Sequence, residues 1–314
     1  MGDKYGGTIS TFEFFQRFPD EQAAIDAIEA RRWENGVTCP YCEGDRTTRM
    51  KKSNYHQCNN KECRKQFTVR TGTIFERSHI PLHKWLYAMY LLQTARKGIS
   101  SMQLSKELGI TQKSAWFLLH RLREAFDIEA VRMDGEVEID ETYIGGKEEN
   151  KHESKKLRAG RGVVGKQTVL GMRDREGRVV AKPIKDNKSR TIQPEILKTI
   201  EEGATLYTDE HKAYSGLDKL YKHETVKHSA KEYVNEMAST NGVESVWSVI
   251  KRGYNGVYHH WSKKHMRRYV NEFVFRLNEG NVRNHTMVRM DHIIRNAVGK
   301  RLRYQDLIAG GPAY

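Results

Sequence analysis

Long apolar runs are absent from this chain of 314 residues. Its most apolar stretch, Trp85 to Leu92, is much shorter than the about 18 apolar residues that a transmembrane helix needs, so no membrane span is expected. The first residues also lack the basic and then apolar order of a secretion signal. These absences predict a cytoplasmic protein with no membrane partner, and the length is sufficient for two or three domains.

Acidic residues are too few to balance the basic ones. The chain has 54 Lys and Arg residues against 40 Asp and Glu residues, which gives a formal net charge of +14 and a pI of about 9.5. A charge of this sign and size favours a polyanionic partner, and nucleic acid is the commonest one.

Cysteine is scarce, and all four cysteines lie between Cys39 and Cys63. Cysteines this close together do not suit the disulfide framework of a small secreted protein. They form two pairs, Cys39-Pro-Tyr-Cys42 and Cys58-Asn-Asn-Lys-Glu-Cys63, separated by fifteen residues. Each pair can bring two thiolates to one metal ion, and four thiolates complete the tetrahedral shell of a structural Zn²⁺. The alternative, a redox-active dithiol, would need one pair and not two.

The residues around the cysteines predict a zinc ribbon. Tyr55–Cys58 and Lys65–Val69 have the pattern of its strands. A closed site of four sulfurs is structural, because it stabilises a small domain whose hydrophobic core is too thin without it. Several basic side chains on or near the ribbon give it a surface suited to DNA: Arg46, Arg49, Lys51, Lys52, Arg64 and Lys65.

After the ribbon the apolar residues recur with a helical period. Two short helices are expected at Ser101–Leu108 and Lys113–Phe126, joined by the turn Gly109-Ile-Thr111. This arrangement fits a helix-turn-helix whose second helix enters the DNA major groove, with Lys113 and Arg121 as candidate DNA contacts. The alternative is a helical hairpin that only packs.

From Asp134 to Leu277 strand patterns and helix patterns follow one another. The expected strands are Glu136–Ile144, Gln167–Asp174, Arg178–Lys185, Thr205–Thr208 and Glu224–Lys227, and the expected helices are Thr191–Glu202, a short helix around Tyr214 and one that begins at Asn241. Three antiparallel strands, then alternating helix and strand, and then a closing helix are typical of a ribonuclease-H-like α/β domain.

Three acids in this segment are candidate metal ligands. The first and fourth strands are expected to be parallel neighbours, which places Asp140 and Asp209 side by side at their carboxyl ends, while Glu244 projects from the closing helix. Carboxylate oxygens are the ligands that two Mg²⁺ ions require for phosphodiester chemistry. Glu141 and Glu210, next to these acids, are expected to lie behind them or to face solvent. Taken singly, each acid is also compatible with a solvated surface position.

Two further stretches have alternative interpretations. The polar and basic stretch of residues 145–166, which contains Lys155 and Lys156, is either a DNA contact or a solvated insertion. Aromatic residues from Tyr254 to Trp261 lie among Lys251, Arg252 and other cations, and either stack on unpaired bases or pack in the core.

Taken together, the motifs resemble the DDE transposases of bacterial insertion sequences that carry an N-terminal zinc ribbon, the ISXO-like group related to the Merlin elements. The resemblance runs from about Thr11 to Asn278. It is carried by Cys39-Pro-Tyr-Cys42, Phe67–Phe75, Ile139–Gly146, Thr208–Tyr214 and Asn241–Gly253.

The resemblance implies that Asp140 and Asp209 are the first two metal-binding acids and that Lys251, with Arg252 beside it, faces DNA. Either Glu244 or Asn241 is then the third residue of the site. They lie three residues apart on a helix and can both reach it, and a third carboxylate balances two Mg²⁺ ions better than an amide does. Both are therefore kept as catalytic candidates, and Glu244 is preferred as the metal ligand.

The function implied is a DNA transposase that binds the terminal inverted repeats of its element and catalyses cleavage and strand transfer with two Mg²⁺ or Mn²⁺ ions. One structural Zn²⁺, a homodimer on double-stranded DNA and a location at the bacterial nucleoid are also implied. A catalytically inactive DNA-binding regulator descended from a transposase is the alternative. A structure-selective nuclease on the same fold would need the acids but not the two DNA-reading modules.

Five parts are expected along the chain. They are an N-terminal helical segment at 1–35, the zinc ribbon at 36–75, the helix-turn-helix at 80–130, the DDE catalytic domain at 134–280 and a basic tail at 281–314.

Overall fold

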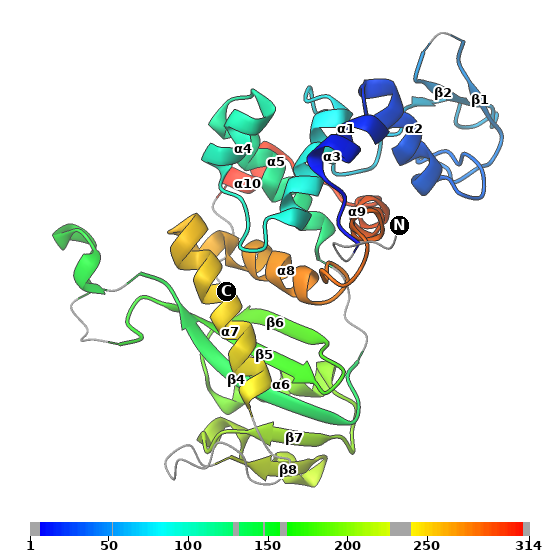
Figure 1. Cartoon of the computed structure of the whole chain (residues 1–314). Helices are drawn as coiled ribbons and strands as arrows, with labels where there is room; N and C mark the ends of the chain where they lie inside the picture. Colours follow the sequence, from blue (N-terminus) through cyan, green and yellow to red (C-terminus); the bar gives the residue numbers. More distant parts are fainter. Residues whose placement is uncertain are drawn as a thin grey trace. The chain divides into compact units, whose positions relative to one another are not determined.

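The structure is a computed structural model (Figure 1). It describes residues 7–51, 53–127, 132–146, 148–157, 162–226 and 240–309. The chain divides into two compact units. The first comprises the described residues of Met1–Ile128 together with Glu279–Ala309, and the second those of Glu129–Asn278. None of the helices in the described ranges is long and apolar enough to span a bilayer.

Two short helices open the first unit. Helix α1 spans Thr11–Arg17 and α2 spans Glu21–Arg32. As expected for an acid placed just before a helix, Asp20 caps α2 by accepting a hydrogen bond of 2.8 Å from the amide of Ala23.

A small three-stranded sheet follows, in the order β1-β2-β3. Its strands are β1 Thr47–Arg49, β2 His56–Cys58 and β3 Gln66–Phe67, and both pairings are antiparallel. β2 and β3 lie within the two predicted ribbon strands, whereas β1 was not predicted. The core beside the sheet is thin, with the His56 ring stacked on Phe67 at 5.5 Å and edge-on to Trp33 at 5.1 Å. A sheet this short needs a further source of stability.

Five further helices lie in the described part of the first unit: α3 Leu82–Thr94, α4 Ser101–Leu108, α5 Gln112–Ala125, α9 Thr286–Asn296 and α10 Tyr304–Ile308. The predicted turn between α4 and α5 is present. Gly109 has a left-handed φ of 58°, and Thr111 caps α5 through the amide of Ser114.

The segment predicted as a separate basic tail returns to the first unit instead. Helix α9 packs against α2, α3 and α5. Arg289 on α9 is buried, and its guanidinium donates to the carbonyl of Gln93 at 2.7 Å and to the Thr286 hydroxyl at 3.0 Å. A buried arginine that binds a distant carbonyl fixes this return of the chain.

The second unit is built on a five-stranded sheet with the order β6-β5-β4-β7-β8 (Figure 1). The strands are β4 Glu136–Ile144, β5 Gln167–Asp174, β6 Val179–Ile184, β7 Thr205–Thr208 and β8 Lys222–Thr225, and the α-helices are α6 Ser189–Thr199, α7 Asn241–Gly253 and α8 Met266–Leu277. β4, β5 and β6 are antiparallel, and β4, β7 and β8 are parallel. The three predicted antiparallel strands and the predicted parallel pairing of the first and fourth strands, β4 and β7, are therefore confirmed.

The sheet has a separate core on each face. Val137 and Ile139 of β4 pack with the apolar residues of α6, whereas Ile144 packs with those of α7 and α8. Because side chains alternate along a strand, Glu138 and Asp140 point to the face that α7 covers. The apolar residues of β4 thus identify the face of the sheet on which the two acids lie.

Candidate functional site

Asp140 lies at the centre of β4 and faces α7. Its Oδ2 atom accepts a hydrogen bond of 2.8 Å from the indole Nε1 of Trp247. Burial raises the pKa of Asp140. The hydrogen bonds from Trp247 and from the Glu141 backbone lower this pKa, and the negative charges of Asp209 and Glu244 raise it further. The two acids predicted to join Asp140 are therefore near enough for their charges to act on it.

Asp209 immediately follows β7, the parallel neighbour of β4. The register pairs Glu138 with Tyr207, and the same offset continued by two residues brings Asp209 beside Asp140. The Asp209 carboxylate accepts a hydrogen bond of 3.0 Å from the amide of His211, which holds it at the end of the strand. This juxtaposition is the one expected from parallel pairing.

Glu244 and Asn241 both lie on the first turn of α7, and both are exposed. The hydroxyl of Thr240 lies 3.4 Å from Glu244 Oε1. Both candidates for the third residue are thus presented by the helix that covers Asp140. Oxygen donors of this kind suit Mg²⁺ or Mn²⁺. Among the described residues, the carboxylate oxygens of these three acids are farther apart than the ligand atoms around a single metal ion would be.

Glu141 is not solvent-facing, which corrects one of the two positions expected for it. Its side chain is 8% exposed on the opposite face of β4, accepts a hydrogen bond from Tyr214 Oη and lies 3.5 Å from His211 Nδ1. Burial raises the pKa of Glu141, and Asp209 and Asp140 add to the shift. The sequence reasoning missed Tyr214 and His211 as partners, although both lie in the motif that follows Asp209. Glu210 is exposed, as expected.

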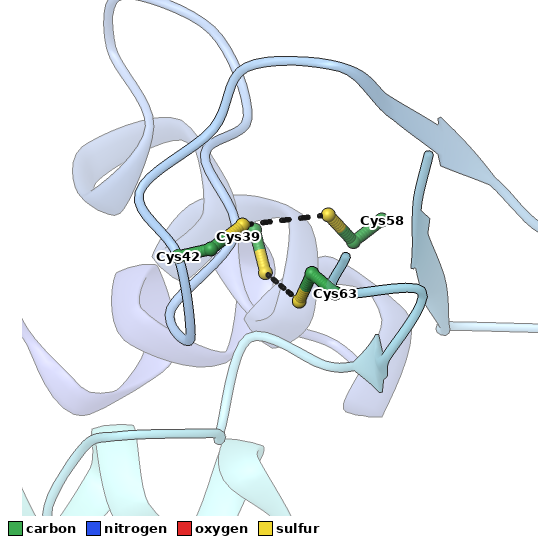
Figure 2. Close-up of side chains that lie close together, drawn as sticks. All are labelled: Cys39, Cys42, Cys58 and Cys63. Carbon is green, nitrogen blue, oxygen red and sulfur yellow. Dashed lines mark hydrogen bonds between the residues drawn. The ribbon is translucent and has the colours of Figure 1, made fainter. Parts of the chain in front are cut away.

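The four cysteines converge in the first unit (Figure 2). Their sulfur atoms all lie within 4.8 Å of one another, with Cys39 and Cys63 3.7 Å apart and Cys42 and Cys58 3.6 Å apart. Asn60 Nδ2 lies 3.4 Å from the Cys42 sulfur. Four soft donors at these separations fit one tetrahedral Zn²⁺.

Two features of the turns place the thiols. Glu43 and Arg64, which directly follow the second cysteine of each pair, have left-handed φ values of 58° and 47°. A Cβ added to Gly44 would lie 2.0 Å from Asn60 Nδ2, so a larger residue there would displace the Asn60 side chain from its position beside Cys42. A hydrogen bond from the Gly44 backbone is the main reason that the pKa of Cys42 falls to about 7, which favours the thiolate that binds metal.

Most of the predicted DNA contacts are on the surface. Lys251 and Arg252 are exposed in the last turn of α7, and Lys113 is exposed at the start of α5 with its Nζ 4.8 Å from the Tyr304 ring. Lys156 is half-buried and forms an ion pair of 2.9 Å with Glu153. The side chain of Lys155 lies outside the described residues.

Arg121 does not have the surface position that its predicted DNA contact requires. Its residue is 3% exposed, and its guanidinium lies over the rings of Trp85 and Phe117 and donates a hydrogen bond of 2.6 Å to the Glu76 carbonyl. Burial lowers the pKa of Arg121 to about 10, so it remains charged at neutral pH. The side chain has a packing role inside the first unit. Helical periodicity could not distinguish this face of α5 from the exposed one, because a long arginine can cover apolar surface.

The aromatic residues after α7 pack together. Trp261 is 3% exposed, is stacked on Tyr269 at 4.8 Å and lies edge-on to Tyr254 at 5.2 Å. Tyr258 donates a hydrogen bond of 2.6 Å to the buried Glu272. Of the two interpretations of these residues, packing is the one observed.

Replacing Asp140 by Asn is expected to raise the melting temperature of the metal-free protein, by about 2–4 °C for each 1 kcal/mol of stability gained in a domain of this size. The pKa of Asp140 is higher in the fold than in the unfolded chain. Protonation therefore stabilises the fold, and this contribution is lost as pH rises through the folded pKa. Asn carries no charge and avoids the loss.

Thermal unfolding at pH 7 in the presence of a chelator tests this expectation, with the exposed Glu210→Gln as the matched control. The gain should disappear in acid, where Asp140 is itself protonated. A melting temperature below that of the parent at pH 7 would contradict it.

Two segments of the chain match known protein families. Residues 19–66 match the transposase zinc-ribbon domain, and residues 132–278 match the ISXO2-like transposase domain. Over 278 residues the chain is 31% identical to a Halobacterium salinarum protein described as an uncharacterized protein in transposable element ISH50. The alignment covers 82% of this chain and 91% of that protein. The chain belongs to the ISXO2-like transposases with an N-terminal transposase zinc ribbon.

Proposed function

We propose that this protein is an active DNA transposase that cuts the ends of its element and joins them to target DNA at the site formed by Asp140, Asp209 and Glu244. The observation that carries the proposal is the convergence of these acids. Asp140 and Asp209 end up side by side through the β4–β7 register, and Glu244 acts on the pKa of Asp140 from the covering helix. Membership of a transposase family favours DNA cleavage and joining as the reaction, and the three carboxylates are residues that this reaction can use.

The sheet supports assignment of the catalytic domain to the ribonuclease-H-like class. Its three antiparallel strands and the parallel β4–β7 pair form the layout expected from the sequence for that class. In this sheet the carboxyl end of β7 lies beside the middle of β4, where Asp140 is located. Sites near the carboxyl ends of parallel strands are typical of α/β folds.

Asp140, Asp209 and Glu244 would hold two Mg²⁺ or Mn²⁺ ions. When bound, such ions lower the pKa of water and stabilise the charge that develops on the attacking and leaving oxygens of a phosphodiester. The reaction consists of two in-line displacements. Water first attacks the phosphodiester at an element end and breaks its P–O3′ bond, which leaves a 3′-hydroxyl on one side and a 5′-phosphate on the other. This 3′-hydroxyl then attacks a phosphodiester of the target, forms a new P–O bond and displaces the 3′-oxygen of the target strand.

The chain's own residues position the DNA for these steps. Lys251 lies seven residues after Glu244, which is about two helical turns, so the two side chains project from nearly the same face of α7. Lys251 and Arg252 there would hold the phosphate backbone close to the acids. Holding the scissile phosphate in place accelerates the reaction, because the entropic cost of bringing the phosphate and its attacking group together has already been met on binding.

Recognition of the element ends is proposed for the first unit. The basic zinc ribbon and the α4–α5 helix-turn-helix would contact the terminal repeats, with exposed Lys113 at the start of the second helix. Lys155 and Lys156 of the second unit are proposed as further DNA contacts. Joining two ends to one target requires two active sites, which favours a homodimer on DNA.

A Mg²⁺-dependent assay on DNA that carries the element's own terminal repeats tests the proposal. The parent protein should release 3′-hydroxyl ends at the repeats and join them to a second DNA, and should do neither on DNA without repeats. End-specific binding with no chemistry in Mg²⁺ or Mn²⁺ would replace the proposal with a DNA-binding regulator.

The same assay separates Glu244 from Asn241. Glu244→Gln is expected to reduce cleavage by about 10²-fold or more, because removing a carboxylate weakens the hold on two divalent cations. Asn241→Ala should have a smaller effect, since a neutral amide contributes less to that hold. The half-saturating Mg²⁺ concentration, measured beside the rate, should rise for Glu244→Gln. The opposite ranking would assign the third position to Asn241.

A further inference from the structure

The amino end of α7 is held to β4 by a buried acid that is not one of the candidate metal ligands. The Glu138 side chain is 6% exposed. Its Oε2 accepts a hydrogen bond of 2.8 Å from the amide of Val243, and its Oε1 lies 3.1 Å from Arg175 Nη1. The first amides of a helix have no partner within the helix, and the Thr240 side chain does not cap them. Glu138 supplies one such partner and places negative charge at the positive end of the helix.

A second hydrogen bond joins the same two elements one helical turn later. Trp247, four residues after Val243, donates its indole N–H to Asp140, which lies two residues after Glu138. Residues four apart on a helix share a face, as do residues two apart on a strand. Two such bonds along one line fix both the position of α7 along β4 and its rotation. They therefore also fix where the first turn presents Glu244.

Two glycines make room for this arrangement. Gly171 pairs with Asp140 across β4 and β5, and a Cβ added there would lie 2.3 Å from Cη2 of the Trp247 ring. A Cβ added to Gly242 would lie 2.5 Å from Oε2 of Glu138. Real Cβ atoms do not approach other heavy atoms so closely, so the absence of a side chain at both positions permits the close contact of helix and sheet.

We infer that Glu138 and Trp247 form a two-point attachment that positions the metal site, with Glu138 setting the start of α7 and the Trp247 indole orienting the Asp140 carboxylate. Both are positioning residues. The indole donates to Oδ2 of Asp140 and so fixes the orientation of the carboxylate. Hydrogen-bond partners of metal ligands fix ligand orientation, and their loss typically weakens metal binding by about 10–100-fold. The inference rests on the proposed metal-binding role of Asp140.

The simpler interpretation is that Trp247 only fills the core between α7 and the sheet, where it is 4% exposed. Trp247→Phe separates the two interpretations, because it keeps an aromatic ring and removes the N–H. Trp261→Phe is a matched control in the same core, since the Trp261 Nε1 atom has no hydrogen-bond partner in the described part of the chain. Glu138→Gln keeps an acceptor for the Val243 amide, whereas Glu138→Leu removes it.

The experiment measures Mn²⁺ affinity by electron paramagnetic resonance on the full-length protein and its variants, with circular dichroism melts beside it. Trp247→Phe and Glu138→Leu should each bind Mn²⁺ about tenfold more weakly than the parent. Trp261→Phe and Glu138→Gln should bind like the parent. Gly171→Ala, which displaces the indole, should also weaken binding.

A second measurement observes the Trp247 indole directly in the parent protein. The chain has five tryptophans, and ¹⁵N labelling resolves their indole N–H signals. Mg²⁺ should shift the Trp247 signal saturably in the parent and leave it unchanged in Asp140→Asn. The Trp247 signal is identified by its loss in Trp247→Phe or by elimination with Trp→Phe at the other four positions.

The outcomes distinguish a failed inference from a failed function. If Asp140→Asn loses Mn²⁺ binding while Trp247→Phe and Glu138→Leu bind like the parent and Mg²⁺ does not move the Trp247 signal, the attachment is overturned and the proposed metal site stands. If Asp140→Asn binds Mn²⁺ as tightly as the parent does, the proposed metal site fails and the inference fails with it.

Discussion

Replacing Asp140 or Asp209 by Asn is expected to abolish both end cleavage and strand joining while DNA binding remains nearly unchanged. Both acids belong to the proposed site, where β7 ends beside the middle of β4, and the charge of Asp209 raises the pKa of Asp140 when no cation is present. A catalytic cation contributes several kcal/mol to transition-state stabilisation. Each 1.36 kcal/mol corresponds to about tenfold in rate, so a loss of at least about 10³-fold is expected.

The assay compares cleavage and joining by the parent and the two variants on terminal-repeat DNA in Mg²⁺, with binding measured by gel shift on the same DNA. Glu210→Gln is the matched control, because Glu210 is adjacent to Asp209 but exposed. It should cleave like the parent. Retained cleavage by Asp140→Asn or by Asp209→Asn would exclude that acid from the catalytic site.

Removal of zinc, by a chelator or by Cys58→Ser, is expected to unfold the ribbon and to reduce end-specific binding to the level of non-specific binding. The strands β1, β2 and β3 contain only three, three and two residues, and few aromatic rings support them. Zinc binding by small zinc domains contributes about 10–16 kcal/mol, which exceeds the stability that such a sheet could have alone. The loss of specific binding is then about 10³-fold or more, the usual gap between specific and non-specific affinity.

Metal analysis should find one zinc per chain in the parent and none in Cys58→Ser. Gel shifts with repeat and non-repeat DNA measure the loss of specificity, and added Zn²⁺ should restore the chelated parent but not the variant. The second unit serves as an internal control, because its sheet does not include the cysteines and its Mn²⁺ affinity should not change. End-specific binding that survives in a zinc-free protein would contradict the expectation.

Local features of this protein were predictable from the sequence. The strand bounds of β4, β5 and β7 and the caps at Asp20 and Thr111 agree with the pattern of neighbouring residues. The cysteine pairs were assigned in the same way, because two cysteines in one tight turn are close together whatever the rest of the chain does. The candidate acids could be selected because a strand period and a parallel pairing specify which residues meet at a strand end.

Tertiary structure decided what depends on contacts between distant parts of the chain. The burial of Arg121, the return of α9 to the first unit and the position of Glu141 beside Tyr214 were not predicted. The attachment of α7 through Glu138 and Trp247 was not predicted either. Each depends on a hydrogen bond or close packing between residues far apart in sequence. Periodicity and local motifs identify the buried face of an element, but only the packed fold decides which partner meets each side chain there.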